Sequence, residues 1–163
     1  MSCLRLAPSI AFLAGAAMLA AAAPALAGTF DDLAGSWSGT GSVTTSDGGR
    51  ESIRCVVTNS VSREGASMRQ SMRCASDSYK FDIGSTVTAD GDAISGSWSE
   101  STRGVTGAVS GSAGNGRVHA RVQGAGFTAQ IDMAARGNVQ SVNIRPTGTD
   151  VTQVSLNMRR RGG

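Results

Sequence analysis

Cys55 and Cys74 are the residues of this sequence whose type and spacing most directly suggest chemistry. Two cysteines can act as a redox pair, contribute to a metal site or form a disulfide. A redox pair usually takes the C-x-x-C spacing, which is absent here. A structural zinc site takes four ligands, and the chain has only one histidine, His119, to add to the cysteines. The spacing therefore favours a disulfide, with a free-thiol role and a metal site as the weaker alternatives.

The segment around the two cysteines predicts how they are brought together. Apolar and polar residues alternate over 50–61 and over 67–75, which is typical of two strands. A turn centred between Glu64 and Gly65 pairs these strands so that Cys55 lies opposite Cys74. Opposed residues at a non-hydrogen-bonded position have Cα atoms about 4.5 Å apart, which a disulfide can bridge. The same register places Asn59 opposite Gln70, so that the two amides can satisfy each other.

Catalytic constellations are missing from the sequence. His119 falls on the outward face of its predicted strand, between Arg117 and Arg121, which indicates a surface histidine. Glu100 lies at a strand end beside Arg103, which indicates an ion pair. The segment GSAGNG is typical of a hairpin turn. It is not a phosphate-binding loop, because such a loop is followed by a helix and none is predicted here. We therefore expect a protein that is not an enzyme and that uses no metal or other cofactor.

The elements that position these residues are predicted to be strands. Gly, Ser and Thr are abundant, whereas Leu33 and Leu156 are the only leucines beyond the N-terminal apolar segment. Turn signals separate about ten alternating segments, at 36–44, 50–61, 67–75, 78–88, 93–100, 104–111, 116–123, 126–134, 139–146 and 151–159. A meander of this length loses its exposed edges by closing on itself. The sequence predicts an all-β, up-and-down antiparallel barrel, with a β-sandwich and an outer-membrane barrel as alternatives.

Each remaining turn predicts the register of its hairpin. Folding the chain about the centre of each turn predicts the inward pairs Cys74–Tyr79, Val87–Ile94, Trp98–Val105, Val109–Val118, Val122–Phe127, Ile131–Val142 and Ile144–Val154. A short helical turn over 30–35 is expected to plug one end of the barrel. One face of the meander is then apolar and the other polar along the whole chain.

The N-terminal segment is typical of a secretory signal peptide. One arginine precedes an apolar run that ends in Ala-Leu-Ala, so we expect cleavage after residue 27 and a single domain over 28–163. A retained membrane anchor is the alternative. Export predicts a periplasmic or secreted protein in an oxidising compartment. The formal net charge is only +3, which argues against nucleic-acid binding. Weak association with anionic envelope surfaces is expected from the outward arginines, Arg69, Arg73, Arg117 and Arg121.

The inward face mixes large and very small side chains, which can leave room for a ligand. Small residues such as Gly96 and Ala120 can create a cavity, or they can let the barrel flatten and fill. We expect a small apolar molecule in the lumen, contacted by Trp37, Asn59, Gln70, Tyr79, Phe81, Trp98, Phe127 and Gln140. The alternative is a solid core in an envelope structural or protein-interaction module, such as an inhibitor of a secreted enzyme.

The segment LAGSWSGTGSV, residues 33–43, resembles the opening strand of calycin-type barrels. Gly35 and Trp37 match the Gly-x-Trp of lipocalins, and Gly39 and Gly41 extend it to the Gly-x-Trp-x-Gly-x-Gly of nitrobindin-like proteins. The resemblance implies that the tryptophan packs across one end of a barrel whose lumen binds an apolar ligand or haem. The nitrobindin-like haem ligand is a late histidine, and no histidine follows His119. The resemblance therefore implies an apolar ligand without haem.

Overall fold

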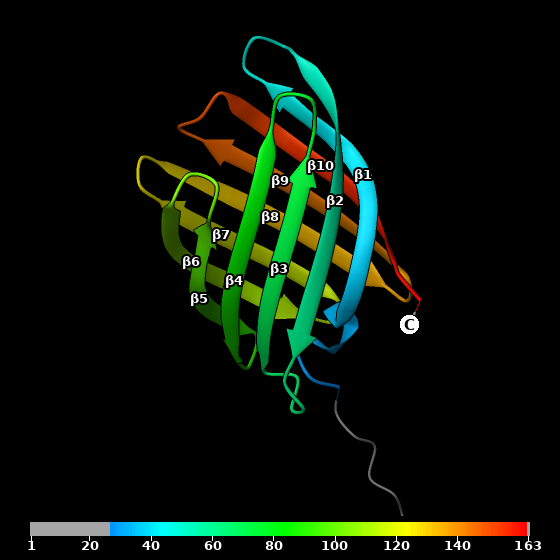
Figure 1. Ribbon diagram of the computed structural model, residues 1–163. Coiled ribbons are helices and arrows are strands. Elements are labelled where there is room, and N and C mark those ends of the chain that lie inside the picture. Colours follow the sequence, from blue (N-terminus) through cyan, green and yellow to red (C-terminus); the bar gives the residue numbers. More distant parts are fainter. Residues whose placement is uncertain (1–26, 163) are drawn as a thin grey trace, which may run out of the picture.

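The computed structural model describes residues 27–162 (Figure 1). Apart from Ala27, the predicted signal peptide lies outside the described residues, and its cleavage stays a prediction. A short 3₁₀ helix, η1 (Asp31–Leu33), precedes ten strands. The strands are β1 (Gly35–Thr45), β2 (Arg50–Val61), β3 (Ser67–Ala75), β4 (Lys80–Asp90), β5 (Ala93–Glu100), β6 (Val105–Gly114), β7 (Arg117–Gly124), β8 (Phe127–Arg136), β9 (Val139–Thr147) and β10 (Val151–Arg160).

The ten strands form one closed antiparallel barrel. Each strand pairs with its neighbours in sequence, and β1 pairs with β10 to close the sheet. The predicted up-and-down barrel is confirmed, and the β-sandwich alternative is wrong. Each strand has one apolar face because apolar and polar residues alternate along it. Closing the sheet turns these faces into the lumen and leaves no strand edge unpaired. No helix within residues 27–162 is long and apolar enough to cross a membrane.

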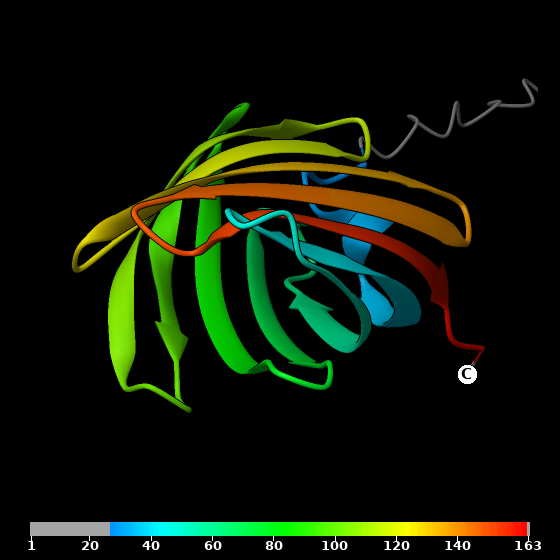
Figure 2. The ribbon, with the colours of Figure 1, turned by 90° about the horizontal axis from the view of Figure 1, so that it is seen from above.

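Glycines allow the sheet to bend sharply enough to close. Figure 2 shows the green strands β3 and β4 running across the orange strands β8 and β9. At Gly39 on β1 an added Cβ would lie 2.0 Å from the carbonyl oxygen of Asn157, and at Gly107 on β6 it would lie 1.7 Å from that of Gln123. Any larger residue would push the neighbouring strand away. These inward glycines therefore serve strand curvature and close backbone contact, as glycine kinks do in barrels.

The structure confirms the register of two hairpins and corrects six. In β2–β3, Cys55 pairs with Cys74 and Asn59 with Gln70, and in β9–β10 Ile144 pairs with Val154, as predicted. The corrected pairs are Cys74–Phe81, Val87–Gly96, Trp98–Gly107, Val109–Val122, Val122–Ala129 and Ile131–Ile144. Every error is an even number of residues, so the inward face was predicted correctly throughout.

The errors come from the turns. The β6–β7 connection is a two-residue turn at Asn115 and Gly116, which have φ angles of 52° and 70°. Positive φ at both positions is typical of the tight hairpin turn that Asn-Gly favours. The turn centre therefore lies two residues later than the centre implied by the predicted pair Val109–Val118. The β3–β4 connection has four residues, 76–79, so its centre lies one residue later than the predicted centre. The partner of Cys74 is therefore two residues later than predicted.

One end of the barrel is plugged by the segment around η1, as predicted. Phe30 and Leu33 are buried beneath the strands. The Trp37 indole N–H donates to the carbonyl oxygen of Leu33 at 2.9 Å. The Arg160 guanidinium lies over the Trp37 ring, 4.3 Å from its centroid, and donates to the backbone carbonyl oxygen of Asp32 at 2.9 Å. The first and last strands are thereby tied to the plug, and this end is closed.

Candidate functional site

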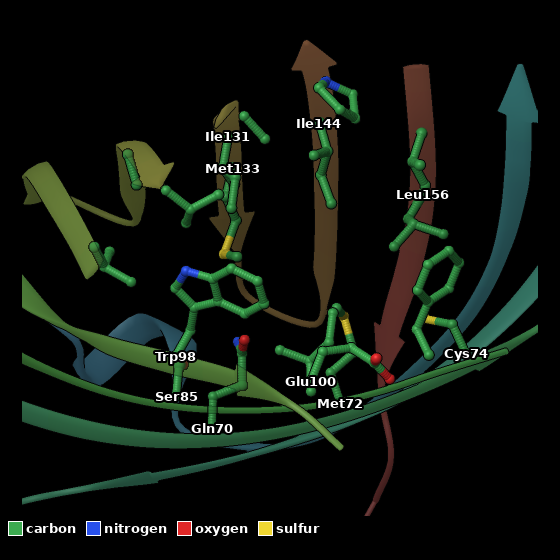
Figure 3. A pocket seen from close by; sticks show the side chains of 18 of the residues that line it. Gln70, Met72, Cys74, Ser85, Trp98, Glu100, Ile131, Met133, Ile144 and Leu156 are labelled. Carbon is green, nitrogen blue, oxygen red and sulfur yellow. The ribbon is translucent and has the colours of Figure 1, made fainter. Parts of the chain in front are cut away.

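A cavity of about 350 Å³ occupies the barrel lumen between the plug and the opposite end (Figure 3). Strands β3, β4 and β5 form one wall, β8, β9 and β10 form the other, and β6 and β7 connect the two walls on one side. The wall is mostly apolar because the inward position of each strand carries an aliphatic, aromatic or methionine side chain. Its lining includes Met68, Met72, Ile83, Val87, Trp98, Val109, Val122, Phe127, Ile131, Met133, Ile144 and Leu156.

Trp98 projects into the middle of the cavity (Figure 3). Its indole N–H donates to the carbonyl oxygen of Gln123 at 3.1 Å, and its ring meets Phe127 edge to face with centroids 5.5 Å apart. Both contacts hold the ring in place. Met72 and Met133 line the cavity from opposite walls. Their flexible thioethers can adjust to ligands of different shape.

The open end of the cavity is an aromatic mouth with charged groups. The rings of Tyr79 and Phe81 are stacked with centroids 6.1 Å apart, and the Arg103 guanidinium lies 5.2 Å from the Phe81 centroid. The Tyr79 hydroxyl donates to Asp150 at 3.1 Å. Desolvation, together with the hydrogen bond to Asp150, holds the pKa of Tyr79 above its ordinary value of 10.0. Tyr79 is therefore a neutral hydrogen-bond donor at neutral pH.

Glu100 is a buried carboxylate that holds the β5–β6 connection. It accepts backbone N–H bonds from Asp82 at 3.1 Å, Thr102 at 3.0 Å and Arg103 at 2.8 Å. Burial alone would raise the pKa of Glu100, but these bonds and one from the Thr102 side chain outweigh it and lower the pKa to about 2. The predicted ion pair with Arg103 is present at 3.7 Å. Glu100 is thus an ionised structural group whose oxygens are already engaged.

A chain of amides runs from the plug to the cavity wall. The Asn59 side-chain amide donates to the carbonyl oxygen of Leu33 at 2.8 Å, and the Gln70 amide donates to Asn59 Oδ1 at 3.1 Å. The predicted pairing of the two amides is confirmed. Asn59 is buried, whereas Gln70 lines the cavity. Ser85 lies opposite Gln70 on β4 and also lines the cavity.

The structure brings five of the eight predicted ligand contacts together. Gln70, Tyr79, Phe81, Trp98 and Phe127 line the cavity. The other three are buried but do not line it, and they are Trp37, Asn59 and Gln140. Gln140 lies near the closed end, with its amide 2.9 Å from Met133 Sδ. Alternation predicts that a side chain points inward but not how deep along the axis it lies, which is why these residues were grouped with the others.

The sequence did not identify several residues of the cavity. Met72 and Met133 lie on predicted inward positions, and the period-two spacing of Met72 with Cys74 and of Met133 with Ile131 was the available signal. Arg103 and Asp150 come from the connections at the mouth, where alternation stops. Only the pairing of the neighbouring strands shows that these connections surround one opening.

Cys55 and Cys74 form the predicted disulfide, with Cα atoms 4.1 Å apart. Both residues are buried, and Cys74 forms part of the cavity wall. The bridge joins directly opposed positions of β2 and β3. A buried disulfide of this kind is typical of proteins that fold in an oxidising environment.

His119 lies on the outer face of β7, as the alternation predicts, and takes part in a surface charge cluster. Its Nδ1 lies 2.8 Å from Asp132 Oδ1, and Arg145 also pairs with Asp132. The hydrogen bond from His119 lowers the pKa of Asp132, and the positive charge of Arg145 lowers it further. The outward arginines of β3 and β7 lie on strands that are not adjacent in the barrel, and Arg73 pairs with Asp82 at 3.3 Å. Association with anionic surfaces stays a prediction.

A second recess, of about 340 Å³, lies beside the mouth and contains three carboxylates, those of Asp47, Glu51 and Asp150. The Thr45 hydroxyl donates to Asp47, and the backbone N–H of Ser78 donates to Glu51 at 3.1 Å. The hydrogen bond from Thr45 lowers the pKa of Asp47. The side chains of Ser78 and Ser76, followed by the Ser78 backbone N–H, lower the pKa of Glu51. Within residues 27–162, no group of three or more His, Cys, Asp or Glu side chains is arranged to hold a metal ion.

No protein-family model and no curated protein matches this chain. The resemblance to calycin-type barrels therefore rests on the opening strand, residues 33–43, and on the closed antiparallel barrel that contains it. Ten strands, a tryptophan packed at the closed end and a lumen cavity are all compatible with a calycin-like fold.

Proposed function

We propose that this chain is an exported binding protein that carries one small apolar molecule in its barrel lumen. The observation that supports this most strongly is the cavity of about 350 Å³, whose wall is almost entirely apolar. Small-molecule sites usually occupy about 300–1,000 Å³ and combine an apolar lining with a few polar groups. Gln70, Ser85 and Arg103 are such polar groups here.

Binding, rather than catalysis, is the proposed role of the lumen. A general acid or base needs a free proton-transfer atom next to the substrate. Two carboxylates among the described residues line the cavity. That of Glu100 has its oxygens engaged by three backbone N–H groups and Arg103, and that of Asp150 accepts the Tyr79 hydroxyl. The apolar wall favours a ligand whose main contribution to binding is the removal of its own apolar surface from water.

The disulfide supports export as part of the proposal. Cys55 and Cys74 are both buried in the bridged state, and such bridges persist in the periplasm or outside the cell. The apolar N-terminal segment, residues 1–27, supports the same assignment through its sequence pattern. A periplasmic or secreted carrier meets apolar molecules that have low solubility in water.

Displacement of a neutral fluorescent probe, N-phenyl-1-naphthylamine, tests the proposal. The native protein is expected to bind the probe with one-to-one stoichiometry and with enhanced fluorescence. Ala120→Phe should reduce binding at least tenfold, because Ala120 lines the cavity and the ring would occupy the ligand's space. Ala108→Phe is the matched control, since Ala108 is exposed on β6, and it should bind the probe like the native protein.

Two results would reject the proposal. One is the absence of saturable probe binding to folded native protein. The other is equal loss of binding in the Ala120→Phe and Ala108→Phe variants, which would place the probe outside the lumen. Either result would favour the alternative of an envelope structural or protein-interaction module.

A further inference from the structure

We infer that the lumen selects apolar molecules that carry a hydroxyl group, that Gln70 Oε1 accepts the hydrogen bond of this hydroxyl, and that the Ser85 hydroxyl donates to its oxygen. The inference rests on the proposed function, because it names the class of ligand that the same cavity takes.

The orientation of the two amides is fixed by a backbone carbonyl. The Leu33 carbonyl oxygen can only accept, and it receives the Trp37 indole N–H at 2.9 Å and the Asn59 amide at 2.8 Å. Asn59 must therefore direct its nitrogen toward the plug and its oxygen toward Gln70. Gln70 must in turn donate its nitrogen to that oxygen, at 3.1 Å. The remaining atom of the Gln70 amide, Oε1, is an acceptor whose direction follows from this chain.

Gln70 Oε1 faces a cavity that offers it no donor. No hydrogen bond from residues 27–162 reaches Gln70 Oε1, and within the same range the Ser85 hydroxyl has no hydrogen-bond partner. The Trp98 indole N–H is the nearest candidate by strand pairing, but it is already donated to Gln123. Figure 3 shows the Gln70 side chain directed into the cavity beside Trp98.

Gln70 and Ser85 form one polar spot in an otherwise apolar region. They are directly opposed on β3 and β4, so their Cβ atoms share a face at about 4.5–5.5 Å. Both positions lie between the plug and the mouth. The nearest charged residue by strand pairing is Glu100, two positions beyond Trp98 on β5, and its oxygens are engaged by backbone N–H groups. A ligand hydroxyl placed here can donate to Gln70 Oε1 and accept from the Ser85 hydroxyl. A carboxylate would instead direct an acceptor oxygen at Gln70 Oε1, which is repulsive.

Two isomeric ligands separate the contribution of this hydrogen bond from that of apolar burial. 1-Octanol and 1-methoxyheptane have the same atoms, but only the alcohol can donate a hydrogen bond. The native protein is expected to bind 1-octanol about 3- to 10-fold more tightly, which corresponds to one net hydrogen bond. Sodium octanoate should bind more weakly than 1-octanol. Each constant is measured by displacement of N-phenyl-1-naphthylamine.

Two variants connect the preference to the proposed atoms. Ser85→Ala leaves the amide chain intact and should weaken 1-octanol and 1-methoxyheptane by a similar factor, because the Ser85 hydroxyl can donate to the oxygen of either ligand. Gln70→Met removes the acceptor and should bring the ratio close to one. Since Gln70→Met also leaves Asn59 Oδ1 without its donor, Ser85→Ala provides the test of the ligand's position if the Gln70 variant does not fold. Unchanged binding of both isomers to Ser85→Ala would place the ligand oxygen elsewhere and overturn the inference.

The outcomes separate this inference from the proposed function. Equal binding of the two isomers to native protein that does bind the probe would overturn the inference and leave the proposed function standing. A preference for the alcohol that survives Gln70→Met would also overturn it. Absence of probe and alcohol binding altogether would overturn the proposed function and the inference with it.

Discussion

Replacement of both Cys55 and Cys74 by alanine is expected to lower the free energy of unfolding by about 3 kcal/mol. The disulfide joins residues with a sequence separation of 19, and in the chain-entropy model a closed loop of this length restricts the unfolded chain by about that amount. The folded barrel should keep its structure, because β2 and β3 remain paired along their whole length without the bridge.

Most of this effect comes from the unfolded state, so a second measurable quantity should also change. An unbridged chain exposes more surface when it unfolds, so the dependence of the unfolding free energy on urea should become steeper. Urea titration followed by tryptophan fluorescence measures both quantities, since Trp37 and Trp98 are packed in different parts of the barrel. The loss corresponds to a decrease in melting temperature of roughly 10 °C for a domain of this size.

Reduction of the native protein provides the matched control. Native protein in reductant, unfolded and refolded, should have the stability of the double-alanine variant, and the variant itself should not respond to reductant. Alkylating reagents should not label Cys55 or Cys74 in the folded native protein, because both sulfurs are bonded to each other and both residues are buried. A stability loss below about 1 kcal/mol, or rapid labelling of the folded protein, would refute the reasoning, since either result means that the bridge does not constrain the chain.

Three other predictions concern the wall, the mouth and the exterior. Glu100 has a pKa of about 2 against an ordinary 4.5, so its contribution to stability is complete above about pH 5 and is lost as the pH falls toward 2. Glu100→Gln should cost about 1–3 kcal/mol at pH 7 and flatten the acid side of the stability profile, and an unchanged acid side would contradict this. Gly107→Ala should destabilise the barrel by several kcal/mol, because its Cβ would lie 1.7 Å from the carbonyl oxygen of Gln123, whereas Gly84→Ala, with its nearest atom at 3.6 Å, should change stability little. Similar urea midpoints for the two variants would exclude the close contact. Retention on anionic vesicles through the outward arginines should fall steeply between low and physiological salt, and salt-independent retention would reject that contact.

The sequence predicted the strands and their faces well because both depend on a local pattern. A period of two residues is read directly from apolar side chains, and an error of two in the register leaves the face unchanged. The β2–β3 register was correct because the turn around Glu64 and Gly65 is symmetric about its centre. The β6–β7 register was wrong because Asn115 and Gly116 form a tighter turn than the whole glycine-rich segment suggested.

The cavity was harder to predict because it depends on three-dimensional relations between strands. Trp98 and Phe127 could be placed in the lumen from alternation alone. The separation of Trp37 from them depends on the plug, which occupies the lumen at one end. The close approach of Gly107 to the neighbouring strand depends on the curvature of the closed sheet, and no pattern along one strand reports it.

The affinity of the native protein for a series of 1-alkanols of increasing length tests the central claim most directly. Each additional methylene group buried in the lumen contributes about 0.8 kcal/mol, so the dissociation constant should fall roughly fourfold per carbon until the cavity of about 350 Å³ is filled, and then level off. Ala120→Phe should reach the plateau at a shorter chain than native protein or Ala108→Phe. A dissociation constant that does not depend on chain length, or the same plateau in all three proteins, would contradict an apolar ligand in the lumen.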